Sequence, residues 1–390
     1  MSRGSISKYE GKKGTSWRIR FVTGYNEHGR PIVRSHTVKG TKREAEVKLR
    51  ELLKEVDNGT FVEPSNITLE EFINKWFETH RQGISHSTEL RYKVDIKNHI
   101  IPGLGSIKMQ KLTTMQVQEF VTQLHKEGFR GNGSPRGLSS RSIQGCVGLL
   151  KLALEQAIEW GFLNRNPVKG VKIPRVKDKE PQFITEEQAA AILTALEGTY
   201  VWLPTLIAFH TGARRGEILA LSWDCVDLDS ATIKISRSFS LNDASGPIFK
   251  EPKTKAGRRI VEIGQTLVKA LKVYRKDQVK AQLAAGERWN NQRNLVCTKK
   301  DGGIINPNAL SELFSYNARQ LGIDVTFHCL RHTHVSMLIK AGVAINVISA
   351  RIGHSNTSTT LDVYSHLLPG MSRDAVDRFE DLLNKPLTNS

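Results

Sequence analysis

The sequence contains few cysteines and no long apolar segment. Its 390 residues include only Cys146, Cys225, Cys297 and Cys329, and no two of them have the close spacing of a zinc ribbon. We expect these cysteines to be reduced thiols. No apolar run is long enough to span a bilayer, and the first residues lack the apolar core of a signal peptide. These absences predict a cytoplasmic protein with no membrane partner.

Acidic residues are also scarce relative to basic ones. There are 57 lysines and arginines against 39 aspartates and glutamates, which gives a formal net charge of +18. Such a chain favours polyanions, and nucleic acid is the first candidate because neutralising phosphates releases condensed counterions. The charge alone does not exclude ribosomal, membrane-surface or heparin-binding proteins. The length predicts two or three domains.

The first part of the chain, residues 1–62, is predicted to be a small β-sheet with one helix. Ser16 to Val22 alternates apolar and basic residues, which is the period of a half-exposed strand. Asn26 to Arg30 indicates a turn before a second strand over 31–38. Thr41 is followed three residues later by Glu44, the pattern of a capping box at a helix start.

The remaining sequence divides into three further parts. Residues 63–168 show helical periodicity and are predicted to be an all-α domain. Residues 169–180 form a basic, proline-containing linker. Residues 181–390 are predicted to be mixed and mostly α, with a small antiparallel sheet. Four helices are predicted in the all-α domain. The first starts at Thr68, and the second runs over 85–99 and is broken by Pro102–Gly105. The third runs over 115–124 and the fourth over 139–160.

Scattered basic side chains before the last domain are candidates for contacts with DNA. Scattered lysines and arginines more often form a solvated face. On the N-terminal strands, however, they favour a sheet that enters a DNA groove when they are considered together with the rest of the sequence. The candidates are Arg18, Arg20, Arg34, Lys93, Arg141 and Lys172.

Two segments of the last domain have the pattern of phosphate-binding sites. Thr211 to Glu217 places a glycine before a helix start that carries Arg214, which would aim backbone N–H groups and a guanidinium at one anion. Glu251 to Arg259 is predicted to be a hairpin with a basic tip that contains Lys253 and Lys255. Taken alone, the first could be an ordinary helix cap and the second a solvated hairpin tip.

Two later segments contain histidine, arginine and tyrosine. His328 and Arg331 are three residues apart and would share a helix face. His328 and His332 also suggest a metal site, but the zinc-protease pattern needs a glutamate where Cys329 stands, so no metal or other cofactor is expected. The fourth segment holds Gly353-His354 and, ten residues on, Tyr364, which alone would fit a capping turn and a core phenol.

Taken in order, the four segments resemble the tyrosine recombinases, also called phage integrases. The resemblance covers about residues 180–385. The family pattern is matched by Arg214 with Glu217, by Lys253 or Lys255, by His328 and Arg331, by His354, and by Tyr364. Ile352 replaces the commoner leucine before Gly353. Lys253 is preferred because Pro-Lys-Thr is similar to the family motif, but Lys255 stays a second candidate.

The resemblance implies a role for each of these residues. Tyr364 would attack a DNA phosphodiester and form a 3′-phosphotyrosine. Arg214 and Arg331 would clamp the phosphate, and His354 would donate to it. Lys253 would be the general acid, His328 the proton acceptor, and Glu217 a support for Arg214 or His328.

It also implies a layout and a set of partners, similar to integrases of temperate phages and Gram-positive conjugative transposons. Residues 1–62 would bind arm-type DNA, 63–168 core-type DNA, and 181–390 would be catalytic. The enzyme would integrate and excise a prophage or conjugative transposon. The partners would be double-stranded attachment sites, a homotetramer on DNA, and a directionality factor or host DNA-bending protein. A segment over Ser372 to Leu383 would dock on a neighbouring protomer.

Two other functions fit parts of the pattern. A type IB topoisomerase-like enzyme or a telomere resolvase uses the same residues, but the basic N-terminal sheet argues against both. A non-catalytic DNA-binding regulator would not need Arg214, Arg331 and Tyr364 together.

Overall fold

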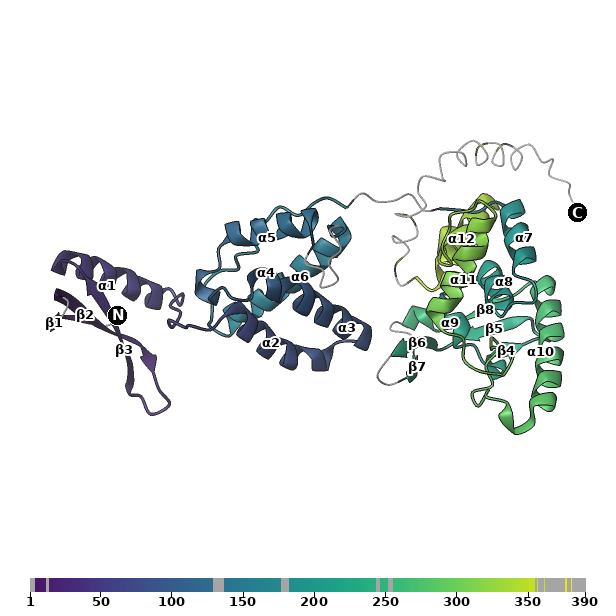
Figure 1. Ribbon diagram of the computed structural model, residues 1–390, viewed down its shortest axis with the longest axis horizontal. Helices are drawn as coiled ribbons and strands as arrows, with labels where there is room; N and C mark the ends of the chain where they lie inside the picture. Colours follow the sequence, from purple (N-terminus) through teal and green to yellow (C-terminus); the bar gives the residue numbers. More distant parts are fainter. Residues whose placement is uncertain are drawn as a thin grey trace, which may run out of the picture. The chain divides into compact units, whose positions relative to one another are not determined.

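The computed structural model folds as two compact units, Met1–Asp178 and Lys179–Ser390 (Figure 1). The structure describes residues 4–11, 14–128, 137–176, 182–242, 246–251 and 255–354, together with positions 356, 361, 376 and 380. None of the helices in these ranges is long and apolar enough to cross a membrane.

The first unit begins with an antiparallel sheet and a helix packed against it (Figure 1). The sheet has the order β1-β2-β3, and α1 follows it directly. The predicted capping box is confirmed, since Thr41 and Glu44 exchange hydrogen bonds at the start of α1. Ile19, Phe21 and Leu52 form part of a small core between sheet and helix. The elements are β1 (Gly4–Gly11), β2 (Gly14–Tyr25), β3 (Pro31–Lys39) and α1 (Lys42–Asp57).

The strand register separates two faces of this sheet. Ile19 and Phe21 point toward α1 and are buried. Side chains alternate along a strand, so Arg18 and Arg20 lie on the opposite, open face. Arg34 is paired with Phe21 and therefore lies on the helix side. The three arginines predicted to contact DNA thus do not share one face.

A helical core follows in the same unit, as predicted. Phe72, Trp76 and Leu150 lie among its fully buried side chains. Thr68 and Ser139 cap their helices as expected. The main helices are α2 (Leu69–His80), α3 (His86–Asp95), α4 (Ile101–Leu104), α5 (Thr114–Lys126) and α6 (Ser140–Glu159).

The second of these helices ends at Leu104, within the predicted break Pro102–Gly105, but it runs five residues past the predicted end at 99 and includes Pro102. The chain stays helical from His86 to Leu104, through a widened π turn at Ile96–Ile100. In this turn the Ile101 N–H donates to Ile96 O instead of to the usual fourth carbonyl back. The shift fits the missing N–H of Pro102, because a π turn relieves the hydrogen bond that proline cannot make.

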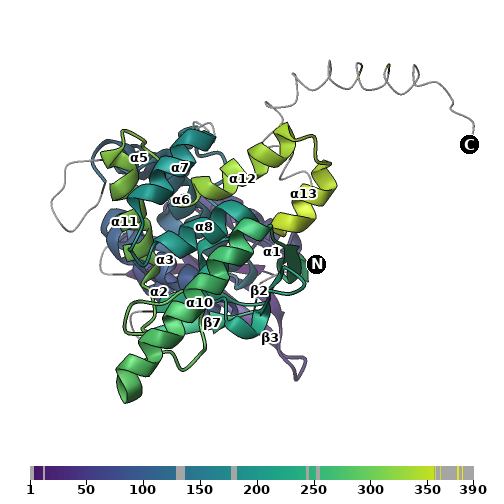
Figure 2. The ribbon, with the colours of Figure 1, turned by 90° about the vertical axis from the view of Figure 1, so that its right-hand side faces the viewer.

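The second unit is mostly helical and contains two small antiparallel sheets. One sheet has the order β4-β5-β8, and β6 pairs with β7 in the other. Figure 2 shows α12 and α13 as a pair beside α8. The helices are α7 (Glu186–Ala195), α8 (Trp202–Thr211), α9 (Arg215–Leu219), α10 (Gln265–Ala285), α11 (Pro307–Gln320), α12 (Cys329–Lys340) and α13 (Ile345–Ile352). The strands are β4 (Val226–Asp227), β5 (Thr232–Ile235), β6 (Ser238–Asn242), β7 (Gly246–Lys250) and β8 (Arg259–Glu262).

Helix α8 lies in the core of this unit. Between Leu203 and Ala208 every residue of α8 is buried. Gly212, in the left-handed conformation with φ +62°, ends α8. A Cβ at Gly212 would lie 2.7 Å from the His334 ring and 3.1 Å from Ile352. Only glycine therefore lets α8, α12 and α13 approach this closely.

The predicted position of the basic hairpin tip was wrong. Ile235 pairs with Arg259, but Ser238 pairs with Lys250, and the chain reverses between Asn242 and Gly246. The basic segment therefore lies between β7 and β8 along the chain, and the hairpin of β6 and β7 has its turn elsewhere. Gly246, the first residue of β7, adopts the left-handed conformation with φ +72°.

Candidate active site

Arg214 lies at the junction of α8 and α9, where Glu217 holds it in place. It is the N-cap residue of α9. Its backbone N–H donates to Glu217 Oε2 over 2.9 Å, and its Nη1 donates to Glu217 Oε1 over 2.9 Å. The side chain of Arg214 is 43% exposed while that of Glu217 is 4% exposed. The buried carboxylate thus anchors a guanidinium whose other edge stays accessible.

Glu217 is shared between two arginines. Its Oε2 also accepts a hydrogen bond of 2.9 Å from Arg259 Nη2, and the Arg259 side chain is 6% exposed. Burial alone would raise the pKa of the Glu217 carboxyl, but the hydrogen bond and charge of Arg259, reinforced by Arg214, hold that pKa below its usual value. Glu217 is therefore ionised at neutral pH.

Arg331 connects the start of α12 to the end of α8. It lies in the first turn of α12, is buried, and donates from Nη1 to Gly212 O over 2.7 Å. His328 is the N-cap residue of this helix, one position before its first turn. The two side chains predicted to share a helix face therefore both come from the α12 start.

His354 directly follows the end of α13. Gly353 ends that helix in the left-handed conformation, and its carbonyl accepts a hydrogen bond of 3.4 Å from Arg214 Nη2. Burial and then the charges of Arg331 and Arg214 lower the pKa of His354 to about 4. The structure thus brings Arg214, Arg331 and His354 together from three helix ends.

Two further histidines adjoin this cluster. The rings of His328 and His332 meet edge to face with centroids 4.9 Å apart. Burial and the charge of Arg331 lower the pKa of His328, and burial and His328 lower that of His332 to about 4. Both rings are therefore neutral near pH 7 and can accept a proton. Within the described ranges, no group of three histidine, cysteine or acidic side chains is arranged to hold a metal ion.

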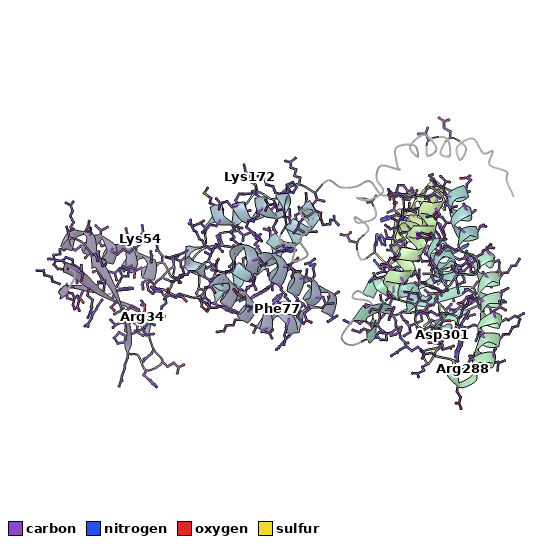
Figure 3. All side chains as sticks on the ribbon, viewed as in Figure 1. Arg34, Lys54, Phe77, Lys172, Arg288 and Asp301 are labelled. Carbon is purple, nitrogen blue, oxygen red and sulfur yellow. The ribbon has the colours of Figure 1, made fainter. Side chains whose placement is uncertain are left out.

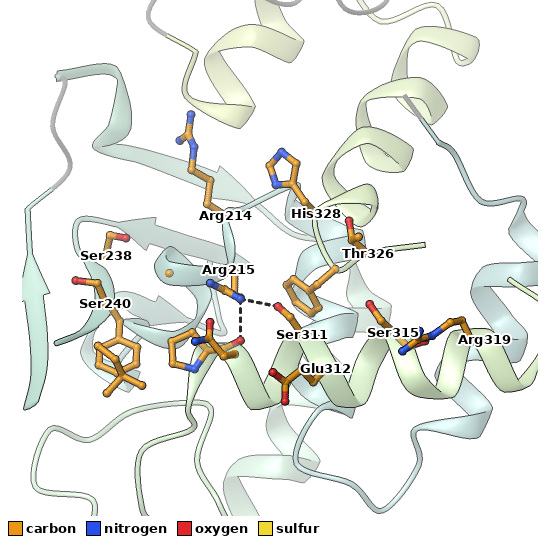
Figure 4. Close-up of a pocket in the computed structure, with 16 residues that line it drawn as sticks. Arg214, Arg215, Ser238, Ser240, Ser311, Glu312, Ser315, Arg319, Thr326 and His328 are labelled. Carbon is orange, nitrogen blue, oxygen red and sulfur yellow. Dashed lines mark hydrogen bonds between the residues drawn. The ribbon is translucent and has the colours of Figure 1, made fainter. Parts of the chain in front are cut away.

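A groove of about 830 Å³ opens beside the cluster (Figure 4). Arg214 and His328 lie at its rim, and α11 forms one wall. Arg215 points into it and donates to Ser311 Oγ over 2.6 Å and to Pro307 O over 2.8 Å. This groove gives an extended ligand access to Arg214 and His328.

Several predicted site residues lie outside the described residues. These include Lys253 and Tyr364, and only the backbone of Lys255 is described, in the short turn Lys255–Gly257. Of the segment Ser372 to Leu383, only positions 376 and 380 are described. The nucleophile and the general acid therefore stay predictions.

The six basic residues of the first unit that were predicted to contact DNA do not form one common surface cluster with free side chains. Arg34 pairs with Glu63 and Lys93 with Glu89. Lys172, like Arg34 labelled in Figure 3, is exposed, and its backbone is clamped by two hydrogen bonds to Gln118. Arg20 and Arg141 are exposed.

The charged residues that support the cluster, Arg259 and Arg351, were not predicted from the sequence. Arg259 is the inward-facing cation of β8 described above. Arg351 donates from Nε to His334 Nε2 over 3.2 Å and from Nη2 to His210 O over 2.9 Å. His334 Nδ1 lies 2.7 Å from Phe209 O, and burial, then Arg351, lowers its pKa to about 4. The available signal was that Arg259 lies two residues before the apolar Val261 in a predicted strand. Both side chains therefore point to the same, inward face.

Gly353 offers a test of how tightly the cluster is packed. Gly353→Ala would place a Cβ 2.8 Å from Ala256 O and 2.8 Å from Arg259 Nη1. We expect it to lower the melting temperature more than Gly322→Ala. Both glycines have nearly the same φ, +72° and +73°, but a Cβ at Gly322 would meet no described atom within 4 Å. The left-handed backbone costs about 1–2 kcal/mol in either variant, so calorimetry of the pair isolates the clash. Equal losses would mean that the contact relaxes freely.

Two models of known families match the chain. One, described as the phage integrase family, matches residues 182–370, and the other, described as phage integrase, N-terminal SAM-like domain, matches residues 68–125. Together they cover more than half of the chain. They include the helices of the first unit from α2 to near the end of α5, and the arginine and histidine cluster.

Individual relatives cover nearly the whole chain. A protein named tyrosine recombinase XerC-like, from Caldanaerobacter subterraneus subsp. tengcongensis, is 29% identical over 385 residues, which span 94% of this chain and 96% of the relative. The structure of the Tn1549 transposon integrase with transposon right end DNA superposes with a TM-score of 0.68 at 20% identity, over 80% of this chain and 99% of the other. A lambda integrase tetramer bound to a Holliday junction gives a TM-score of 0.54 at 16% identity, over 90% of this chain and 93% of the other.

Proposed function

Since the chain belongs to the phage integrase family and is a tyrosine site-specific recombinase of mobile elements, we propose that Arg214, Arg331 and His354 hold the scissile DNA phosphate for attack by Tyr364. The convergence of the three helix ends carries this proposal. Gly212 O, Gly353 O and Glu217 link these ends through hydrogen bonds of 2.7 to 3.4 Å. The guanidiniums of Arg214 and Arg331 are therefore held in place before DNA arrives.

The proposed reaction conserves the bond energy of the DNA backbone. The Tyr364 oxygen bonds to phosphorus while the bond to the 5′-oxygen breaks, which gives a 3′-phosphotyrosine and a free 5′-hydroxyl. A 5′-hydroxyl of the partner strand then attacks the phosphotyrosine and releases the tyrosine. The transition state gains negative charge on its non-bridging oxygens. Two guanidiniums stabilise that charge because each can donate two parallel hydrogen bonds.

The histidines differ in their proposed tasks. His328 is neutral near pH 7, so it can accept the proton of Tyr364, whose phenol has a pKa near 10 when unperturbed. His354 is also neutral before DNA binds and donates one ring N–H to the phosphate. Lys253, or Lys255 in its place, protonates the 5′-oxygen that leaves.

The first unit and the other protomers are proposed to select the DNA. Residues 1–62 would bind arm-type sites and 63–168 core-type sites, with 169–180 as linker to a catalytic part at 181–390. The lambda integrase relative was solved as a tetramer on a Holliday junction, which supports a homotetramer on DNA. The segment Ser372 to Leu383 is proposed to join its protomers. The enzyme would act on a prophage or conjugative transposon in the bacterial cytoplasm, with a directionality or DNA-bending partner. Relatives named as recombinases favour this function over the topoisomerase-like and regulator alternatives.

The open face of the N-terminal sheet gives a prediction about DNA affinity. Replacing both Arg18 and Arg20 with alanine should weaken binding to arm-type DNA. It should also make the slope of log K against log salt concentration shallower by nearly one unit per lost phosphate contact. Replacing Arg34 should change both much less, because it lies on the helix side and already pairs with Glu63. Fluorescence anisotropy over a salt series measures both quantities. An equal effect of Arg34 would place the DNA on another face.

The catalytic proposal is tested with a nicked suicide duplex that carries the element's own attachment site. Direct repeats at the element's ends identify that site. A covalent complex that resists denaturant and is digested to a phosphotyrosine peptide supports the proposal. Absence of the complex from wild-type protein that binds the duplex contradicts it.

A further inference from the structure

Arg259 is the charged side chain that connects the separate parts of the cluster. It is the first residue of β8 and pairs with Ile235 of β5. Its side chain faces inward and is 6% exposed. A guanidinium this buried is costly unless each of its nitrogens finds an acceptor.

Each of its three nitrogens donates to a different segment. Nη2 donates to Glu217 Oε2 over 2.9 Å, and Nε to Arg351 O over 2.7 Å. Nη1 donates to Gly257 O over 3.2 Å. These acceptors belong to the start of α9, the end of α13 and the turn that contains Lys255. A planar fork with donors in fixed directions can hold three such segments at set distances, whereas a lysine could not.

Two of these contacts lead directly to proposed catalytic residues. Glu217 in turn fixes the position of Arg214, whose Nη1 and backbone N–H both donate to its carboxylate. Arg351 is three residues before His354, and Gly353 between them packs so closely on Arg259 that even a Cβ would clash. Arg259 therefore sets where Arg214 and His354 lie relative to each other.

The charges support the same conclusion. The single carboxylate of Glu217 lies between two guanidiniums, so neither arginine neutralises it alone. If Arg259 were lost, the whole charge of Glu217 would act on Arg214 and draw the guanidinium toward the buried carboxylate. The phosphate would then meet a donor that is displaced and partly neutralised.

From this geometry, and resting on the function proposed above, we infer that Arg259 is a positioning residue for strand cleavage, acting through Glu217 on Arg214 and through Arg351 on His354. It does not line the groove beside Arg214. Its contribution therefore lies in the rate of cleavage and not in the affinity for DNA.

Single-turnover cleavage of the suicide duplex tests the inference. Arg259→Met should slow cleavage about a hundredfold, the effect of displacing a reacting group by about 1 Å, while the Kd for DNA stays unchanged. Arg259→Lys should recover part of the rate, because it restores the charge but not the fork. The control is Arg258→Met, which removes the neighbouring arginine. Arg258 is exposed and pairs with Glu251 at the surface, so cleavage should stay at the wild-type rate.

A double mutant separates positioning from general support. If Arg259 acts through Glu217, then Arg259→Met combined with Glu217→Gln should slow cleavage by less than the product of the two single losses, since the two residues share one contact. Losses that multiply would overturn the inference, and so would wild-type cleavage by Arg259→Met. A larger Kd for Arg259→Met with unchanged cleavage would overturn it as well.

A readout without cleavage distinguishes this inference from the proposed function. The Nε–H resonance of Arg214 in the full-length protein, assigned by its disappearance in Arg214→Lys, should shift in Arg259→Met and not in Arg258→Met. If wild-type protein formed no adduct but the resonance shifted, the proposed function would fail and the positioning role would stand. An unchanged resonance in Arg259→Met would overturn the positioning role.

Discussion

Replacing Tyr364 with phenylalanine is expected to abolish the covalent protein–DNA complex and leave DNA binding intact. The substitution removes one oxygen, which is the only atom that the proposed reaction takes from this side chain. No other change in the chain should have so complete an effect, since every other group only lowers a barrier. The measurement is adduct formation on the nicked suicide duplex, with binding to the same duplex determined separately by anisotropy.

A matched control is available in Tyr316. This tyrosine is 56% exposed on α11, and Tyr316→Phe removes the same atom from the same unit. It should form the adduct at the wild-type rate. A covalent complex with Tyr364→Phe would show that another residue is the nucleophile, and loss of DNA binding by this variant would show that Tyr364 has a structural role as well.

Local signals in the sequence predicted much of the fold. A helix cap depends on residues within three positions of each other, so Thr41 and Thr68 located helix starts that the structure confirms. These predictions succeeded because the interactions that decide them form within one turn of helix.

Predictions that depended on distant pairing were less successful. The hairpin tip was misplaced because the pairing of β6 with β7, in which Ser238 faces Lys250, lies between the paired residues Ile235 and Arg259 and was not predicted. Glu217 and Arg259 are 42 residues apart, and Arg259 and Arg351 are 92 apart. No spacing rule links such residues, so the supports of the cluster became visible only in three dimensions.

The four motifs were found for a different reason. Arg214, His328, Arg331 and His354 each stand at a helix end, where short patterns of glycine and polar residues mark the boundary. Sequence order could predict that such ends meet only through resemblance to a family. The structure adds the atoms that join them, namely Gly212 O, Gly353 O and the Glu217 carboxylate.

Loss of the Arg331 guanidinium should have the second-largest effect on cleavage. Arg331→Ala is expected to slow adduct formation by about 10² to 10³-fold, the usual result of removing a donor that stabilises a developing oxyanion. Since Arg331 is buried and binds Gly212 O over 2.7 Å, alanine could also loosen the junction of α8 and α12. Its melting temperature must therefore be compared with that of the wild-type protein.

Arg331→Lys distinguishes charge from geometry. Lysine keeps the positive charge in nearly the same volume, but its ammonium cannot bind Gly212 O and also present two parallel donors to a phosphate. We therefore expect cleavage by Arg331→Lys to stay far below the wild-type rate while its folding and DNA affinity are close to normal. Arg288→Ala, which removes an exposed arginine labelled in Figure 3, serves as the control and should cleave normally. If the lysine variant cleaved at the wild-type rate, positive charge alone would suffice, and the bidentate clamp would have to be abandoned.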